Sequence, residues 1–376
     1  MKHPPNHIFS HTPESLNAWC RDVGMPAFRA TQILEWVYAK GVADPDAMSN
    51  LGKADRDLLR NQITFLSGAV VRHQRATDGT QKLLVEWDDF GAKAAAPERR
   101  VSLMPGSDTS RQTECVMIPS LDADEQHAPA RFTACISSQV GCPVGCRFCA
   151  SGIGGLDANL SAGRIVEQVW RLSRFEGVRR ISNVVFMGMG EPLANLGSVV
   201  PAIRTLAAPW GLGISARKVT VSTVGLPKAI DKLAEQLDLP VTLALSLHAP
   251  TDEIRRALIP WAEYTTIREL LDACRRWFER TGREVTLEYT LLRGVNDQPA
   301  HARELARLAR TLRANVNLIR YNEVSGVEFE RPRDADVRTF QDVLREGGIN
   351  AHIRASRGRD IAAACGQLRH EQAPQV

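Results

Sequence analysis

The sequence lacks the features that would place it in or across a membrane. Its N-terminus, MKHPPNHIFSHTPESLNAW, has no apolar stretch of the kind found in signal peptides, and no run of 18 apolar residues occurs in the 376 residues. It also lacks a large excess of either charge, with 47 Lys and Arg against 43 Asp and Glu. We therefore expect a cytoplasmic protein with no membrane contact, in which a basic groove for nucleic acid is neither demanded nor excluded.

Cysteine is more informative, because three of the eight copies lie close together. In a chain that is not secreted, this clustering favours metal binding or catalysis in a reducing compartment over structural disulfides. The length suits one large domain and a smaller one, and a hydrophobic share of 44% is ample for a sizeable core.

The first third of the chain changes from helical to strand patterns. Residues 12–66 carry apolar side chains at helical spacing, with Thr12 placed to cap the first helix and Leu16 and Trp19 on one face. The segments KLLVEWDD, RRVSLMPG and ECVMIPS then read as strands. Between them, GAKAAAPE and LDADEQHAPA read as surface loops.

From about residue 131, short β-branched runs alternate with amphipathic segments. The runs are RFTACIS, NVVFMGM, KVTVSTV, VTLALSL, EVTLEYTLL, NVNLIRY and NAHIRA. This alternation indicates a parallel sheet with crossover helices, closed or partly closed into a barrel, with its chemistry at the C-terminal strand ends.

The stretch CISSQVGCPVGCRFCASG, which begins at Cys135, holds the clustered cysteines. Cys142, Cys146 and Cys149 have the spacing C-x3-C-x2-C, and the glycine and proline between them favour a tight turn. A zinc site needs four ligands, and the sequence has no second C-x2-C or H-x3-H pair. Three thiolates on a 4Fe–4S cluster leave one iron open to a small molecule. The spacing predicts such a cluster, with structural zinc as the alternative.

A C-x3-C-x2-C loop after the first strand of a βα barrel resembles the radical S-adenosylmethionine (SAM) superfamily, in which the open iron binds SAM and the reduced cluster cleaves it to a 5′-deoxyadenosyl radical. The segment VVFMGMGEPL supports the resemblance, since Glu191 and Pro192 follow a strand and a Gly-rich turn. In the superfamily such a segment lies against the SAM ammonium group, for which carbonyl and carboxylate oxygens are suitable acceptors.

Seven segments in order narrow this resemblance to the RlmN/Cfr family of RNA adenosine methyltransferases, RlmN more closely. They are CISSQVGC, MGMGEPLANL, VTVSTVGLP, ALSLHAPTDEIR, LEYTLLRGVND, NLIRYN and RGRDIAAACGQL. The implied fold is α/β, a partial (βα)6 radical-SAM barrel over residues 131–370. A helical RNA-contacting domain over 1–75 and a β-rich connector over 76–130 would precede it.

The resemblance gives roles to two thiols outside the cluster. Cys365 would be methylated by one SAM, and a second SAM would supply the radical that activates this S-methyl group for addition to adenine. Cys135 would then release the covalent protein–RNA adduct by attacking the Cys365 sulfur, which leaves a transient disulfide. Glu114 would accept the ring proton. The alternatives are packed cysteines and a surface glutamate at the start of a strand.

The remaining implied contacts concern SAM, RNA and an electron donor. The SAM-binding positions are Gly190, Glu191, Ser222, Ser246, Leu247, His248 and Asn322. Candidate RNA contacts are Arg171, Arg174, Arg179, Arg180, Arg354, Arg357 and Arg359, of which the first four suit solvated helix faces equally well. At DANL (157–160), the chain lacks an arginine that the family commonly carries, and RYNEV lacks the usual proline. Both departures bear on substrate choice.

The implied activity is methylation of carbon 2 of an adenosine in 23S rRNA, with tRNA as a further candidate. The alternatives are methylation of carbon 8, as in Cfr, and a non-catalytic iron–sulfur protein that binds RNA. We expect two SAM molecules per turnover, a flavodoxin or ferredoxin as reductant, and a monomer.

Overall fold

The computed structural model describes residues 1–91, 109–120, 129 and 131–368. The predicted strand RRVSLMPG lies outside the described residues, as do nearly all of the predicted loops GAKAAAPE and LDADEQHAPA. The other predicted strands of the first third are present, as β2 (Gln81–Trp87) and β3 (Gln112–Pro119).

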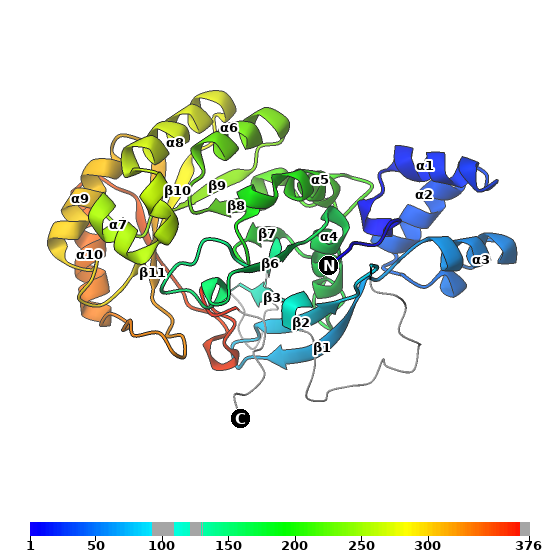
Figure 1. Cartoon of the computed structure of the whole chain (residues 1–376), viewed down its shortest axis with the longest axis horizontal. Helices are drawn as coiled ribbons and strands as arrows, with labels where there is room; N and C mark the ends of the chain where they lie inside the picture. The colour runs from blue at the N-terminus through cyan, green and yellow to red at the C-terminus, as the bar shows by residue number, and fades with distance from the viewer. Residues whose placement is uncertain (92–108, 121–128, 130, 369–376) are drawn as a thin grey trace.

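The N-terminal segment is helical. Helix α1 (Pro13–Asp22) starts with a capping box, in which the Thr12 hydroxyl accepts from the Ser15 N–H and the Ser15 hydroxyl accepts from the Thr12 N–H. Helix α2 (Arg29–Leu34) continues into a π-helical turn, Glu35–Ala39, and α3 (Lys53–Gln62) follows. These helices lie at one end of the molecule, beside the barrel (Figure 1).

One open sheet of ten strands runs through the rest of the described chain. Its order is β1-β2-β3-β4-β7-β8-β9-β10-β11-β12. The strands from β4 onward pair in parallel, whereas β1 (Gly68–Arg75), β2 and β3 extend the sheet antiparallel beyond β4. The parallel strands are β4 (Phe132–Cys135), β7 (Asn183–Phe186), β8 (Val219–Thr223), β9 (Thr242–Ser246), β10 (Val285–Leu291), β11 (Ala314–Arg320) and β12 (Ala351–Arg354).

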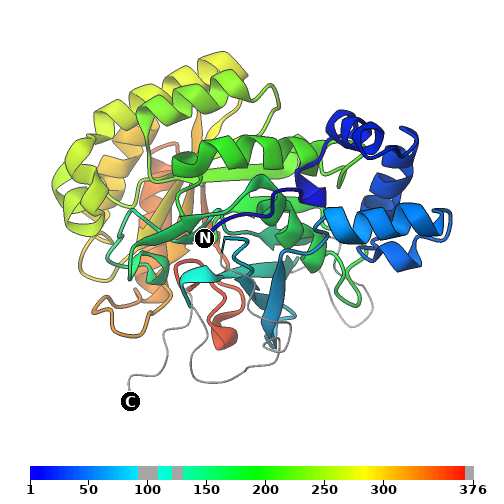
Figure 2. The same cartoon turned by 45° about the vertical axis from the view of Figure 1, so that its right-hand side comes forward.

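Helices connect these strands and cover the outer face of the sheet (Figures 1 and 2). They are α4 (Ala162–Leu172), α5 (Leu196–Ala207), α6 (Pro227–Gln236), α7 (Asp252–Leu258), α8 (Ile267–Thr281), α9 (Pro299–Ala309) and α10 (Asp334–Glu346). All seven residues of β10 are buried, as expected for a central strand covered on both faces. The predicted α/β partial barrel is confirmed: six strand–helix units followed by one more parallel strand.

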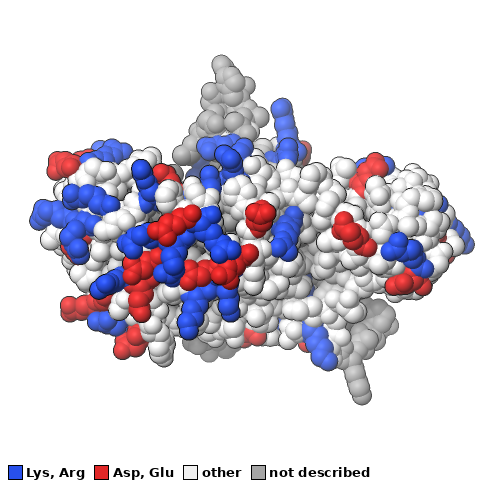
Figure 3. All heavy atoms as spheres, turned by 90° about the horizontal axis from the view of Figure 1, so that it is seen from above, with Lys and Arg blue, Asp and Glu red and all other residues white. Residues whose placement is uncertain are grey.

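The outer helical face does not carry charge of a single sign. Seen from above, Lys and Arg are interspersed with Asp and Glu over these helices (Figure 3). Two ion pairs contribute, Arg276 with Asp231 at 2.9 Å and Arg275 with Asp272 at 2.7 Å. This face therefore offers no broad positive field to an RNA backbone.

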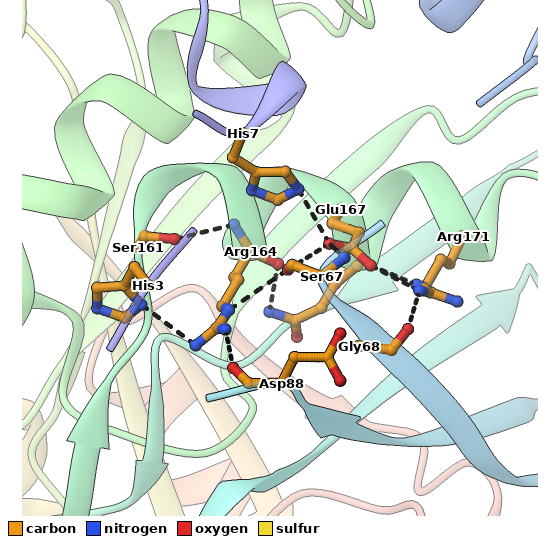
Figure 4. Close-up of polar contacts among 10 residues, drawn as sticks. His3, His7, Ser67, Gly68, Asp88, Ser161, Arg164, Glu167 and Arg171 are labelled. Carbon is orange, nitrogen blue, oxygen red and sulfur yellow. Dashed lines mark hydrogen bonds and ion pairs between the residues drawn. The ribbon is translucent and has the colours of Figure 1, made fainter. Parts of the chain in front are cut away.

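A buried network of charges joins the N-terminal segment to the barrel (Figure 4). Glu167 on α4 contacts His7 Nε2 through its Oε2, at 3.2 Å. The same oxygen accepts from the hydroxyl of Ser67 at 2.7 Å, and Oε1 accepts from Arg171 Nε at 2.8 Å. Arg164, one turn earlier on α4, donates to the carbonyl of Asp88. Helix α4 thus binds both the N-terminal segment and the ends of β1 and β2.

Candidate active site

The loop that carries the three cysteines (residues 142–155, the cluster loop) connects β5 (Gln139–Gly141) to β6 (Leu156–Asn159), and these two strands form a short hairpin. Gly141 has φ +73°, and a Cβ there would stand 2.1 Å from the carbonyl oxygen of Gly155. Only glycine fits this position. The close approach lets the Cys142 N–H donate to that carbonyl at 2.8 Å, which fixes the start of the cysteine loop.

Cys142, Cys146 and Cys149 all line one cavity of about 150 Å³. The three thiols are free, and burial raises the pKa of Cys142 to about 12, so their ionisation needs a metal or other positive charge nearby. No group of three His, Cys, Asp or Glu side chains in the described part of the chain converges as ligands of a single ion. Three thiols that line one cavity are nevertheless the kind of donor that an iron–sulfur cluster takes, so the residues present fit one.

Arg255 is a cation beside this loop that the motif reading does not single out. It is buried on α7 and donates through Nη2 to the Val224 carbonyl at 2.5 Å, while burial lowers its pKa to about 10. Its Nε has no hydrogen-bond partner among the described residues. The Cys146 thiol interacts electrostatically with it. Arg255 lies beside the cysteine loop because of how α7 packs, so no local sequence pattern indicates it.

Glu191 belongs to the segment Gly190–Pro192 (the GEP segment), and backbone groups hold its side chain. Its two carboxylate oxygens accept from the Leu193 N–H at 2.9 Å and the Val224 N–H at 2.7 Å, yet burial still raises its pKa to about 7. Its own N–H donates to Gln139 Oε1 at 2.8 Å. Gly190, with φ +104°, packs so closely on Gln139 that a Cβ would lie 2.7 Å from it. The segment is thereby locked against the cavity wall.

His248 also faces the cavity, in a left-handed conformation with φ +57° that is unusual for histidine. Its Nδ1 accepts from the Thr290 N–H at 3.0 Å, so the neutral ring carries its proton on Nε2. Burial lowers the pKa of His248 to about 3, which keeps the ring neutral. Phe148 stands edge-on to the ring, with centroids 5.0 Å apart.

The cavity collects most, but not all, of the predicted SAM positions. Gly190, Glu191, Ser222, Ser246 and His248 line it. Leu247 is fully buried and is not among the lining residues, and Asn322 lines a second, adjoining cavity.

That second cavity, of about 80 Å³, is where the two other thiols meet. Cys135 and Cys365 both line it, and Cys365 lines the cluster cavity as well. Asn322 Nδ2 donates to the Cys365 carbonyl at 3.2 Å. The Gly366 carbonyl accepts from the Ala150 N–H at 2.7 Å, which brings the Cys365 loop onto the cluster loop. Two segments far apart in the sequence are thus placed together.

Arg354 borders both cavities and was predicted as an RNA contact. Cys365 holds the pKa of Arg354 above its ordinary value, and Glu288 and Cys135 add to the effect. Burial raises the pKa of Cys135 to about 12, and the charge of Arg354 opposes this rise. Arg354 thus interacts electrostatically with both thiols.

The other arginines predicted as RNA contacts fall into two groups, those engaged within the protein and those exposed. Arg171 bonds Glu167, Arg180 donates to the Gly213 carbonyl, and Arg357 pairs with Asp78 at 3.1 Å. Arg174 stacks on Trp170, with its guanidinium carbon 5.7 Å from the ring centroid. Arg179 and Arg359 are exposed, and Arg359 lies beside the Cys365 loop.

Glu114 lies near the thiol pair but lines neither cavity. It is buried on β3, and its Oε1 stands 2.7 Å from Nζ of Lys82, also buried, on β2. Its carbonyl accepts from the Ser137 hydroxyl at 2.6 Å. Lys82 is a second residue that no motif indicated, because only the strand pairing brings it to Glu114.

Comparisons with known proteins agree with this geometry. The family model of the radical SAM superfamily matches residues 136–309, and that of the ribosomal RNA large subunit methyltransferase N-terminal domain matches 7–64.

The chain is 44% identical to a probable dual-specificity RNA methyltransferase RlmN of Gloeobacter violaceus, over 96% of this chain and 94% of that one. It is 42% identical to the Synechocystis protein of the same name, over 98% and 96%. The crystal structure of a radical SAM methyltransferase from Sphaerobacter thermophilus superposes with a TM-score of 0.87, at 40% identity, over 98% of this chain and 100% of that one. The chain therefore belongs to the RlmN family of the radical SAM superfamily.

Proposed function

We propose that this protein methylates carbon 2 of an adenosine in 23S rRNA and in tRNA through a methyl-cysteine on Cys365. The observation that carries the proposal is that Cys365 borders both the cavity of the three cluster cysteines and the cavity of Cys135. A methyl group on Cys365 would reach the radical source on one side and the resolving thiol on the other. The relatives' designation as dual-specificity RNA methyltransferases supports two RNA substrates.

Cys142, Cys146 and Cys149 would hold a 4Fe–4S cluster, which with SAM supplies a 5′-deoxyadenosyl radical. Gly190, Glu191, Ser222, Ser246, Leu247, His248 and Asn322 are the proposed SAM-binding positions. His248 would donate its Nε2 proton to an acceptor on SAM, since its Nδ1 is already engaged by the Thr290 N–H. The serine hydroxyls at the adjacent ends of β8 and β9 are 3.4 Å apart and can both serve a ribose or carboxylate group.

Cys365 would act twice, using two SAM molecules per turnover. As a thiolate it attacks the methyl carbon of the first SAM, forming the S–CH₃ bond while the sulfonium bond breaks. The methyl group then loses a hydrogen atom to the radical from the second SAM, and the resulting carbon radical adds to carbon 2. Gly366, with φ +84°, gives this loop a flexible position next to the cysteine.

Glu114 and Cys135 would complete the reaction. Loss of the ring proton to Glu114, and return of one electron from the adduct to the oxidised cluster that Cys142, Cys146 and Cys149 would hold, would restore the aromatic ring. The Cys135 thiolate then attacks the Cys365 sulfur: the S–S bond forms, the S–CH₂ bond breaks, and its electron pair stays on carbon, which takes a proton to become methyl. A dithiol reductant must reopen the disulfide before the next turnover.

The electron needed for SAM cleavage would come from a flavodoxin or ferredoxin, and we propose a monomer that works in the cytoplasm, where its RNA substrates are. No helix in the described ranges combines the length and apolar character needed to span a bilayer.

Deletion of the gene, with mass spectrometry of digested rRNA and tRNA, tests the proposal. Loss of 2-methyladenosine from both pools is the expected result. Loss of 8-methyladenosine instead would show the carbon 8 activity. Unchanged methyladenosine, together with no SAM cleavage by the purified, reduced protein, would identify a non-catalytic iron–sulfur protein and refute the assignment.

A further inference from the structure

Lys82 is a buried cation placed between two parts of the proposed site. Its side chain is 6% exposed, and its Nζ stands 2.7 Å from Glu114 Oε1. The same Nζ donates to the carbonyl oxygen of Ala362 at 3.1 Å. One ammonium group thus joins the proposed base to the loop that carries Cys365.

The strand register explains why these groups meet. Strands β2 and β3 pair Lys82 with Val116 and Leu84 with Glu114, and strands β3 and β4 pair Val116 with Cys135. Paired residues of antiparallel strands share a face, as do residues two apart along a strand. Lys82, Glu114 and Cys135 therefore lie on one face of the sheet, with the long side chains of the first two within diagonal reach.

The Cys365 loop covers this same face. Ala363 and Leu368 pack in one apolar cluster with Val116 and Cys135. Ala362 has φ +49°, a left-handed conformation that an alanine keeps only where its surroundings enforce it. The bond from the ammonium group to the Ala362 carbonyl is one of the contacts that can enforce it.

The turn between β1 and β2 fixes the beginning of the loop independently. Asp78 Oδ2 accepts from the Gly358 N–H at 2.9 Å, and Arg357 Nη2 donates to the Asp78 carbonyl at 2.7 Å. Asp360 Oδ2 accepts from the Thr77 N–H at 2.9 Å. The loop is therefore anchored to the hairpin without Lys82, which adds a contact three residues before the cysteine.

We propose that Lys82 is a positioning residue for RNA methylation: it holds the Glu114 carboxylate in place, and it holds the Cys365 loop over the sheet face that bears Cys135. The inference rests on the function proposed above. When the adduct loses its ring proton, the proton would pass to the Glu114 carboxylate, the C–H electron pair would stay in the ring, and one electron of the adduct radical would return to the oxidised iron–sulfur cluster. Without the ammonium group, the Glu114 carboxylate would lose the 2.7 Å contact that orients it on this face of the sheet.

The test uses the full-length, cluster-loaded protein and three variants. Lys82→Met removes the charge at similar length, and Lys82→Arg keeps the charge. Lys228→Met changes an exposed lysine on α6 as the matched control. Intact mass after incubation with SAM measures methylation of Cys365, denaturing gels measure the protein–RNA adduct, and nucleoside mass spectrometry measures the released product.

Lys82→Met should methylate Cys365 to an extent similar to wild type, accumulate the adduct, and release product about a hundredfold more slowly, the order of magnitude lost with a general base. Lys82→Arg should restore most of the release rate, and Lys228→Met should match wild type. Release by Lys82→Met at the wild-type rate would overturn the inference. So would equal loss of Cys365 methylation in both Lys82 variants, which would mark a purely structural role. A wild-type protein that makes no methyladenosine would instead refute the proposed function, and this inference with it.

Discussion

Replacing Glu167 by alanine should destabilise the protein more than any surface change, because its carboxylate is the centre of the buried network in Figure 4. Glu167 Oε2 accepts from the Ser67 N–H at 3.0 Å and the Ser67 hydroxyl at 2.7 Å, and stands 3.2 Å from His7 Nε2. Glu167 Oε1 accepts from Arg171 at 2.6 Å. Alanine would leave all of these donors without their acceptor.

The magnitude follows from the burial. The side chain of Glu167 is 0% exposed and that of Arg171 is 11% exposed, so water cannot replace the lost partner readily. Removing one member of a buried ion pair typically costs about 3–5 kcal/mol. This is a large part of the total of about 5–15 kcal/mol that stabilises an ordinary domain. Glu167→Gln keeps the size and one acceptor, and we expect roughly half the loss.

Urea unfolding of the cluster-loaded protein, followed by tryptophan fluorescence, measures the change. Glu279→Ala, at an exposed position on α8, is the control and should shift the free energy of unfolding by less than about 0.5 kcal/mol. A loss below about 1 kcal/mol for Glu167→Ala would refute the reasoning, since it would show that the network is not coupled to folding.

The pH dependence has a definite sign. Burial raises the pKa of Glu167, but hydrogen bonding and charge from His7, followed by Arg171 and Ser67, outweigh it and hold the pKa below its ordinary value. A carboxyl with a depressed pKa contributes stability above its unfolded pKa and loses that contribution as the pH falls through the folded one. The difference between wild type and Glu167→Gln should therefore shrink below about pH 4.

Four further predictions concern the site. Cys135→Ala should trap a covalent protein–RNA adduct on denaturing gels, whereas free, normally methylated RNA would contradict its resolving role. Gly141→Ala should lower the iron content severalfold, because its Cβ would stand 2.1 Å from the Gly155 carbonyl oxygen. Full iron loading of this variant would contradict the steric argument. Cys142→Ala should abolish reductive SAM cleavage, with the iron content as a parallel measure. His248→Phe should raise the KM for SAM about tenfold through loss of one hydrogen bond, and an unchanged KM would exclude His248 as a SAM contact.

The fold class could be predicted because it depends on local patterns. Alternation of β-branched runs with amphipathic segments determines a parallel sheet with crossover helices, and β10 and α8 illustrate both patterns. The continuation of the sheet into β1–β3 was not predicted, because antiparallel pairing of β3 with β4 depends on which edge is free. That choice is made by the assembled sheet.

The candidate site likewise combines features that follow from local sequence patterns with features that depend on long-range packing. The spacing of Cys142, Cys146 and Cys149 is local, so the sequence alone predicted these thiols as cluster ligands, together with the GEP segment that follows the next barrel strand. The family resemblance suggested that Cys135 and Cys365 work together, and their common cavity is a tertiary fact. Positions 365 and 135 differ by 230 residues. Local spacing along the chain cannot predict a contact over that distance in sequence.

The positions of Lys82, Arg255 and Arg354 depend on long-range packing. In the sequence alone they are ordinary basic residues, and Arg354 was predicted as an RNA contact for that reason. Strand register places Lys82 on Glu114, the packing of α7 brings Arg255 to the cysteine loop, and the end of β12 brings Arg354 between two cavities. The sequence predicted which residues could do the chemistry, and long-range packing decided which charges lie beside them, because electrostatic coupling depends on distance and burial in space.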